Sequence, residues 1–359
     1  MLIESLFFEL IQISIGERSV FSHTPNSNDW ISLYSISHKQ SLVGVCFEGI
    51  KILFQRHPEQ VKYLQSELKL KWLAQSLMLQ KKNEIMDEAT SDALAYFRGK
   101  GFPCIVLKGQ GVAQLYGPLT TARQSGDIDV WLSGGRKKVY ALSKQEFGKM
   151  MGANYHHIHF PILDNVEIEA HIYPSFLSNP IRNYHLHRFC KLYEPYDGCG
   201  DYPSINFNRI FILLHCYRHL CGHGVGLRQL MDYYYVLKQG FTESEGKDTL
   251  QWCNKLGMNR FVRATMWVMK TIFNLDDKFI LCEPDEKEGR FLINEILQTG
   301  NMGHSDERFK WGQQRALFRF IESQKRNIHL ITHYPKEVCW SPLFNIVRFC
   351  WIKINGLNS

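Results

Sequence analysis

The spacing of hydrophobic residues predicts helices at both ends of the chain. Apolar positions recur at helical spacing over residues 31–54 and 61–97, with polar residues between them. The glycine- and proline-containing run 99–103 predicts the end of the second stretch. The helical pattern returns beyond residue 208, where glycines interrupt it. Both ends of the chain are therefore expected to be mostly helical.

Short strands are predicted between these helical stretches. Residues 104–107 and 128–132 are brief apolar runs, which are typical of buried strands. Residues 155–163 and 166–172 alternate between apolar and polar, and the Asp-Asn pair at 164–165 between them favours a turn. This second pair of segments predicts a β-hairpin.

Together these patterns predict an α/β (α+β) fold, in which a small mixed sheet is framed by N- and C-terminal helical regions. A chain of 359 residues is longer than a typical single domain. We place an N-terminal helical region at 1–100, the α/β core at 101–200 and a C-terminal helical region at 201–359.

Composition narrows the class of protein only slightly. The net charge of +7 suits a polyphosphate or nucleic-acid ligand but does not identify one. Ten cysteines without a CxxC pair indicate reduced thiols, and no uninterrupted apolar stretch reaches the roughly 18 residues of a membrane span. The first ten residues carry Glu4 and Glu9 and predict an amphipathic helix. We expect a soluble, cytoplasmic protein.

Two aspartates at the start of a predicted strand are the first candidate chemistry. Asp127 and Asp129 belong to residues 126–130 (Gly-Asp-Ile-Asp-Val). Side chains at i and i+2 on a strand point to the same face, so the two carboxylates lie close together. Such close negative charges are costly without a cation, and carboxylate oxygens suit Mg²⁺ or Mn²⁺.

A second group of polar residues lies on the hairpin. Glu167, Glu169 and His171 alternate with apolar residues and share one face. If their strand neighbours the aspartate strand, three or four carboxylates meet and could hold two metal ions about 3.5–4 Å apart. One of the histidines at 156, 157 and 159 could lie beside Glu169, although hairpin histidines are usually on the surface.

The segment after the first strand is a candidate phosphate-binding element. Lys108, Gly109 and Gly111 leave a strand and open a helix, where free backbone N–H groups and the helix dipole attract anions. Arg123 could contact the same phosphates as a fork donor.

The C-terminal region holds two further candidates. His215 and His219 have the i, i+4 spacing of a zinc pair, within a cluster that ends at His223. No companion Glu follows, and such histidines more often line a phosphate-facing cleft or pack inside. Arg228 and Asp232 either lie at the mouth of the site, binding base or acceptor, or form an ion pair that ties this region to the core.

Several motifs occur in one order along the chain and carry a resemblance to a known family. They are residues 107–111 (Leu-Lys-Gly-Gln-Gly), Arg123, residues 126–130 and the Glu-Ala-His run at 169–171, followed by segments 215–219, 226–232 and 326–335. This order resembles the uncharacterised bacterial branch of the nucleotidyltransferase superfamily, whose wider members have polymerase-β-like catalytic cores. No Ser/His/Asp pattern, dinucleotide fingerprint or Walker loop competes with it.

The resemblance implies an enzyme that transfers a nucleoside monophosphate from an NTP such as ATP, with Mg²⁺ and release of pyrophosphate. It implies that Asp127 and Asp129 are metal ligands, and that Glu169, rather than Glu167, is the third carboxylate, as ligand or general base. Lys108, Gly109, Gly111, Arg123 and Gly126 would bind the nucleotide. The superfamily usually has a Gly-Gly or Gly-Ser pair where this chain has Lys108-Gly109, which leaves the donor nucleotide open.

The acceptor is not identified by the sequence. A small molecule such as a sugar or antibiotic, a protein side chain and the end of a tRNA are all compatible with it. Two other functions stay open: a catalytically inactive nucleotide- or RNA-binding protein of the same fold, and a toxin-type protein that acts on tRNA.

Overall fold

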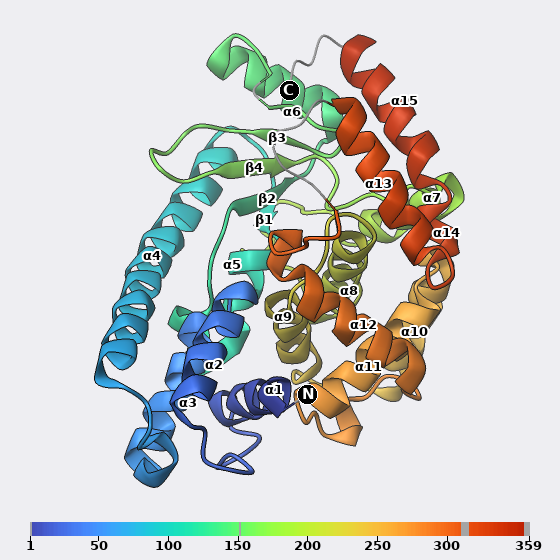
Figure 1. The fold of residues 1–359 in the computed structure, drawn as a ribbon. Helices are drawn as coiled ribbons and strands as arrows, with labels where there is room; N and C mark the ends of the chain where they lie inside the picture. Colours follow the sequence, from blue (N-terminus) through green and yellow to red (C-terminus); the bar gives the residue numbers. More distant parts are fainter. Residues whose placement is uncertain (1, 151, 310–315, 355–359) are drawn as a thin grey trace.

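The computed structural model describes residues 2–150, 152–309 and 316–354 of the chain, and helices surround one small sheet (Figure 1). The helices are α1 (Leu2–Ser14), α2 (Ser27–Lys39), α3 (Val43–Arg56), α4 (Ser66–Gly99), α5 (Lys108–Ala113), α6 (Gly135–Phe147), α7 (Pro180–Lys191), α8 (Ile205–Cys221), α9 (Leu227–Leu237), α10 (Glu243–Leu256), α11 (Asn259–Ile272), α12 (Glu286–Thr299), α13 (Ala316–Leu330), α14 (Pro335–Val338) and α15 (Ser341–Ile354). The strands are β1 (Cys104–Val106), β2 (Ile128–Leu132), β3 (His157–His159) and β4 (Ile168–His171). This helix-rich chain with a small sheet agrees with the predicted α+β class.

The sheet is mixed and has the strand order β1-β2-β4-β3. β1 pairs antiparallel with β2, and β3 pairs antiparallel with β4, which confirms the predicted hairpin. Between these pairs β2 lies parallel to β4. The strand of the two aspartates therefore neighbours the strand of Glu169.

The two faces of the sheet differ in character because side chains alternate along each strand. On one face Val106, Val130 and Ile168 join a hydrophobic core with residues of α4 and α6. On the other face Trp131 stacks on Phe207 of α8, with ring centroids 5.6 Å apart. Asp129 and Glu169 point to this second face. Figure 1 shows α4 on one side of the sheet and α13 and α15 on the other.

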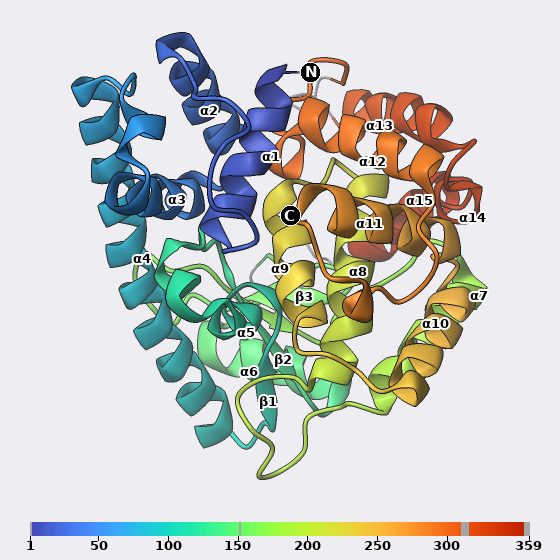
Figure 2. The same cartoon turned by 90° about the horizontal axis from the view of Figure 1, so that it is seen from below.

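A second hydrophobic core joins the N-terminal helices to the C-terminal helices. Figure 2 shows α8 and α9 near the centre of the molecule, with α2 and α3 on one side of them and α1 next to the C-terminal helices. Two buried glutamines connect these parts directly. The Gln12 amide donates to the carbonyl of Ile272 at 3.0 Å, and the Gln40 amide donates to that of Ile296 at 2.9 Å. Residues distant in sequence thus share one interior.

The helical pattern over 31–54 is divided in the structure between α2 and α3. Ser41 has a φ of 55° at the junction, so the chain turns sharply there. α3 then approaches the segment that precedes β2: a Cβ on Gly44 would lie 2.4 Å from the carbonyl oxygen of Ala122. A glycine is required at this position because the two backbones touch.

None of the helices formed by the described residues is long and apolar enough to cross a membrane. All ten cysteines are free thiols, which agrees with the reduced state expected from their scattered positions.

Candidate active site

Asp129 and Glu169 are direct neighbours on the parallel strands β2 and β4. His171, two residues after Glu169, contacts both. Its Nε2 lies 2.6 Å from Oδ1 of Asp129 and 3.3 Å from Oε2 of Glu169. Burial opposes the charge on this imidazole, but the two hydrogen-bonded carboxylates raise the pKa of His171 to about 9. The predicted meeting of the two strands thus brings two carboxylates and one imidazolium together.

Lys108, the first residue of α5, contacts Asp129 and also Asp127 from the end of β1. Its Nζ lies 3.0 Å from Oδ2 of Asp129 and 3.7 Å from Oδ2 of Asp127. Burial alone would lower the pKa of Lys108, but Asp129, Asp127 and Glu169 raise it above its ordinary value. In return Lys108 lowers the pKa of Asp127, against the effect of burial. The Asp127 side chain is 39% exposed and that of Asp129 only 1%, so Asp127 is the more accessible carboxylate.

Two histidines of β3 complete the polar face of the sheet. Nδ1 of His157 lies 2.9 Å from Oε2 of Glu169, and Nδ1 of His159 lies 2.9 Å from Oε1 of Glu167. Burial opposes ionisation of Glu169, but His157 and His171 hold its pKa well below the usual range. His157 thus lies beside Glu169, which was one of the two alternatives for the hairpin histidines, and His159 contacts Glu167 although its side chain is 36% exposed.

The cluster has the composition of a divalent-cation site. Asp129, Glu169 and His171 each offer a ligand atom, and these atoms lie within 4.8 Å of one another. Carboxylate oxygens suit Mg²⁺ and Mn²⁺, and an imidazole suits Mn²⁺ better than Mg²⁺. Lys108 and His171 already offset part of the negative charge, so a metal ion bound to Asp129 must compete with them.

The glycines of the predicted phosphate-binding element have different roles. Gly109 has a φ of 32° and a ψ of −108°, so the chain bends there. A Cβ on Gly111 would lie 2.5 Å from the carbonyl oxygen of Val106, so this glycine is needed for packing against β1. A Cβ on Gly126 would meet nothing within 4 Å. Close packing against β1 is therefore sufficient to require a glycine at position 111, and the binding of a nucleotide by this segment stays a prediction.

Arg123 is held by Asp232 of α9. Its Nε and Nη2 donate to the two carboxylate oxygens at 2.7 and 2.8 Å, and the Tyr116 hydroxyl donates to Oδ1 at 2.6 Å. Arg123 and Asp232 are 3% and 4% exposed. Asp232 thus ties the C-terminal region to the core through Arg123 and not through Arg228, whose Nη1 donates to the carbonyl of Gln124 at 2.7 Å.

α8 carries two histidines and one arginine near the cluster, and the histidines are neutral at neutral pH. Burial lowers the pKa of His215 and of His219 well below the ordinary value, and Lys108 adds to the effect in both. Their rings lie 4.3 Å apart, yet neither histidine belongs to a set of three metal-ligating groups among the described residues. Arg218 lies over the Phe176 ring, 3.6 Å from its centroid. The arrangement favours histidines that line a cleft over a zinc pair.

Comparison with known proteins gives one match. Residues 26–274 match the model of a protein family described as uncharacterised nucleotidyltransferase. No curated protein matches the chain, and no solved structure matches it.

Proposed function

This chain belongs to the family of uncharacterised nucleotidyltransferases, and from that premise we propose that it moves a nucleoside monophosphate from an NTP to an acceptor and releases pyrophosphate. The reaction depends on Mg²⁺ or Mn²⁺. The polar face formed by β2, β4 and β3 is the proposed active site, and the acceptor is a small molecule, a protein or a tRNA.

The observation that carries this proposal is the alignment of Asp129 with Glu169 on adjacent parallel strands. Two carboxylates in that position, with the more exposed Asp127 beside them, make a site for a hard cation at one end of the sheet. Family membership supports the reaction class, and the carboxylates support this location for the reaction.

The residues present fit a divalent cation. Asp127, Asp129 and Glu169 would hold it, and a bound cation would neutralise charge on the triphosphate and lower the pKa of an acceptor hydroxyl. His157 and His171 both contact Oε2 of Glu169 and so fix the orientation of its carboxylate. We therefore assign Glu169 as a ligand in preference to a general base, because its oxygens are already directed by two imidazoles.

Lys108 is close enough to the carboxylates to exchange them for the phosphates of a bound nucleotide. Its ammonium lies between Asp127 and Asp129, and its side chain is 20% exposed. A triphosphate that arrived with a cation would offer Lys108 a new partner as the carboxylates became metal ligands. Positioning and charge compensation would then account for most of the rate enhancement.

The contacts of Asp129 with Lys108 and His171 also favour a second function, which is binding of a nucleotide or RNA without catalysis. Because Lys108 and His171 already neutralise Asp129, the cluster is stable without a metal ion. A protein of this fold that binds a nucleotide or RNA without catalysis would keep such an arrangement. A toxin-type enzyme that acts on tRNA shares the proposed site and differs only in its acceptor.

The first experiment is a calorimetric titration with each of the four ribonucleoside triphosphates, with and without Mg²⁺, alongside an assay for pyrophosphate. The double variant Asp127→Asn/Asp129→Asn tests the carboxylates. Asp164→Asn is the matched control, because it removes an exposed aspartate from the hairpin loop. We expect metal-dependent binding of one triphosphate, weakened at least about tenfold in the double variant and unchanged in the control.

Each other outcome has a definite meaning. Binding that persists without Mg²⁺ and yields no pyrophosphate with any acceptor supports the inactive nucleotide-binding protein. Full activity in the double variant would overturn the assigned site. No binding of any triphosphate, together with tRNA that copurifies with the protein, would replace the nucleotide donor by a macromolecular ligand.

A further inference from the structure

A cavity of about 190 Å³ lies where the end of α8 meets α13, α14 and α15. Its polar lining includes Arg218 and His219 of α8, His223 of the following turn, Glu337 of α14 and Arg348 of α15. None of these five residues belongs to the carboxylate cluster on the sheet.

The cavity carries an excess of positive charge. Burial lowers the pKa of Arg218 to about 10, so its guanidinium stays protonated at neutral pH. Burial also lowers the pKa of Arg348, and no carboxylate contributes to counter that effect. The Nε of Arg348 is buried and has no hydrogen-bond partner in the described part of the chain. The lining of the cavity thus holds two guanidiniums and one carboxylate, that of Glu337, and the carboxylate interacts with Arg218.

Glu337 adds an unused acceptor. Its residue is 5% exposed, and one carboxylate oxygen, Oε1, accepts a hydrogen bond from the backbone N–H of Ser178. The other oxygen, Oε2, is buried and has no partner in the described residues. Buried polar groups are seldom left without a partner in native proteins, so an unused donor and an unused acceptor in one cavity indicate a missing ligand. That ligand must offer an anionic group and a hydroxyl.

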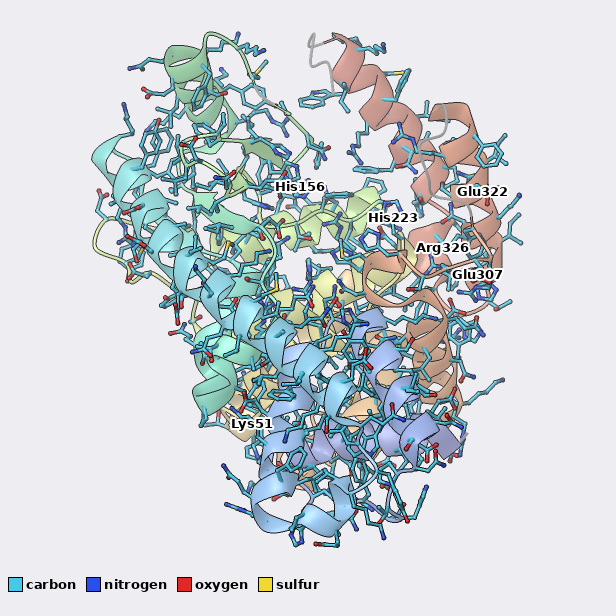
Figure 3. All side chains as sticks on the ribbon, turned by 60° about the vertical axis from the view of Figure 1, so that its left-hand side comes forward. Lys51, His156, His223, Glu307, Glu322 and Arg326 are labelled. Atoms are coloured by element: carbon cyan, nitrogen blue, oxygen red, sulfur yellow. The ribbon has the colours of Figure 1, made fainter. Side chains whose placement is uncertain are left out.

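The cavity adjoins the proposed active site through a shared aromatic wall. Phe176 lines the cavity and packs against Arg218. The His156 ring lies 4.9 Å from the Phe176 ring and 5.3 Å from the His171 ring. In the view of Figure 3, His223 lies between His156 on the strand side and Arg326 of α13. The rings of Phe176 and His156 thus lie between the cavity and His171 of the carboxylate cluster.

We propose that this cavity binds the phosphate group of a hydroxylated phosphate ester. Arg218 and Arg348 would hold the phosphate, and Oε2 of Glu337 would accept from a hydroxyl of the same molecule. Guanidinium groups suit this task because their planar donors match phosphate oxygens in pairs. The assignment of that ester as a substrate of the transfer rests on the proposed function, whereas the binding of phosphate does not.

The test is equilibrium binding of inorganic phosphate and of a hexose phosphate, measured by calorimetry without divalent cations. Arg348→Gln removes one guanidinium from the edge of the cavity, and Arg348→Lys retains the charge without the fork. Lys353→Gln is the matched control, because it removes an exposed cation from the same helix. Asp129→Asn alters the carboxylate cluster and leaves the cavity unchanged, so it tests whether phosphate binding depends on that cluster.

We expect both phosphates to bind saturably and the hexose phosphate to bind more tightly than inorganic phosphate. Arg348→Gln should weaken binding by about ten- to a hundredfold, as expected for a charge-assisted hydrogen bond, and Arg348→Lys should restore part of it. Lys353→Gln and Asp129→Asn should bind as the wild type does. A thermal unfolding curve for each variant checks that it is folded.

Titration with an NTP in the presence of Mg²⁺ then identifies the source of the phosphate. If Arg348→Gln weakens the NTP, the cavity holds the triphosphate of the donor; if it weakens only the hexose phosphate, the cavity holds the acceptor. Failure of wild type to bind either phosphate, or equal binding by folded Arg348→Gln, overturns the proposal. Because phosphate binding is measured without metal or turnover, loss of catalysis in Asp129→Asn does not affect this result.

Discussion

Removal of Asp232 should destabilise the whole protein, because its carboxylate satisfies three buried donor atoms. Asp232→Ala leaves the Arg123 guanidinium without its counter-ion and the Tyr116 hydroxyl without its acceptor. Loss of one partner from a buried ion pair costs about 3–5 kcal/mol, since the remaining charge stays buried. At roughly 2.1 cal/mol/K of unfolding entropy per residue, 359 residues give a fall in Tm of about 4–7 °C.

Calorimetric unfolding of three variants measures this effect and its origin. Asp232→Leu and Arg123→Met should each lower the Tm by a similar amount. The double variant should lose less than the sum of the two, because it removes both charges from the interior at once. A double variant that loses the full sum would contradict the direct pairing.

The same variants test the role that the sequence indicated for Arg123. A residue that binds the triphosphate directly would, when replaced by methionine, weaken nucleotide binding and leave the Tm within about 1 °C of wild type. That result would refute the structural role argued from the contacts with Asp232. We expect the opposite: a large fall in Tm, with nucleotide affinity changed only as far as the variant is unfolded.

Two further predictions concern the segment after β1. Lys108→Met should raise the affinity for Mn²⁺ about tenfold, because it removes a cation that competes for Asp127 and Asp129. Electron paramagnetic resonance of free Mn²⁺ measures this affinity. An unchanged or weaker affinity would contradict the competition. Gly111→Ala should cost about 1–3 kcal/mol of stability, because its Cβ would lie 2.5 Å from the Val106 carbonyl oxygen. Gly126→Ala is its control in thermal unfolding and should be nearly neutral.

Local patterns predicted the parts of the site that lie on regular strands. Alternation put Asp127 with Asp129, and Glu169 with His171, on common faces before any strand pairing was known. The contacts of the hairpin histidines could not be predicted in this way, because they also depend on the register in which β3 pairs with β4. A two-residue turn at 164–165 would pair residue 158 with His171, whereas the structure pairs His157 with His171. One residue of register decides which face of β3 meets the carboxylates, and the turn motif alone does not fix it.

Hydrophobic periodicity and residue spacing do not predict contacts between segments that are distant in the sequence. The partner of Arg123 lies 109 residues away on α9, and periodicity gives the helix but not the segment that it meets. The cavity that contains Arg218, Glu337 and Arg348 is likewise assembled from four helices, α8, α13, α14 and α15. The spacing of Arg228 and Asp232 places both on one side of a helix, but it does not name the partner of Asp232 on another segment.

The hydrogen bond from Gln12 to Ile272 has a consequence for the order in which the chain folds during synthesis. The two residues are 260 positions apart, so a ribosome that adds about 5–20 residues per second takes roughly 13–50 s to supply the partner of α1. During that interval the apolar faces of α1 and α3 lack the surface they finally cover. The nascent chain must therefore be shielded or remain loosely collapsed until α11 emerges, and a fragment that ends after the sheet would be prone to aggregate.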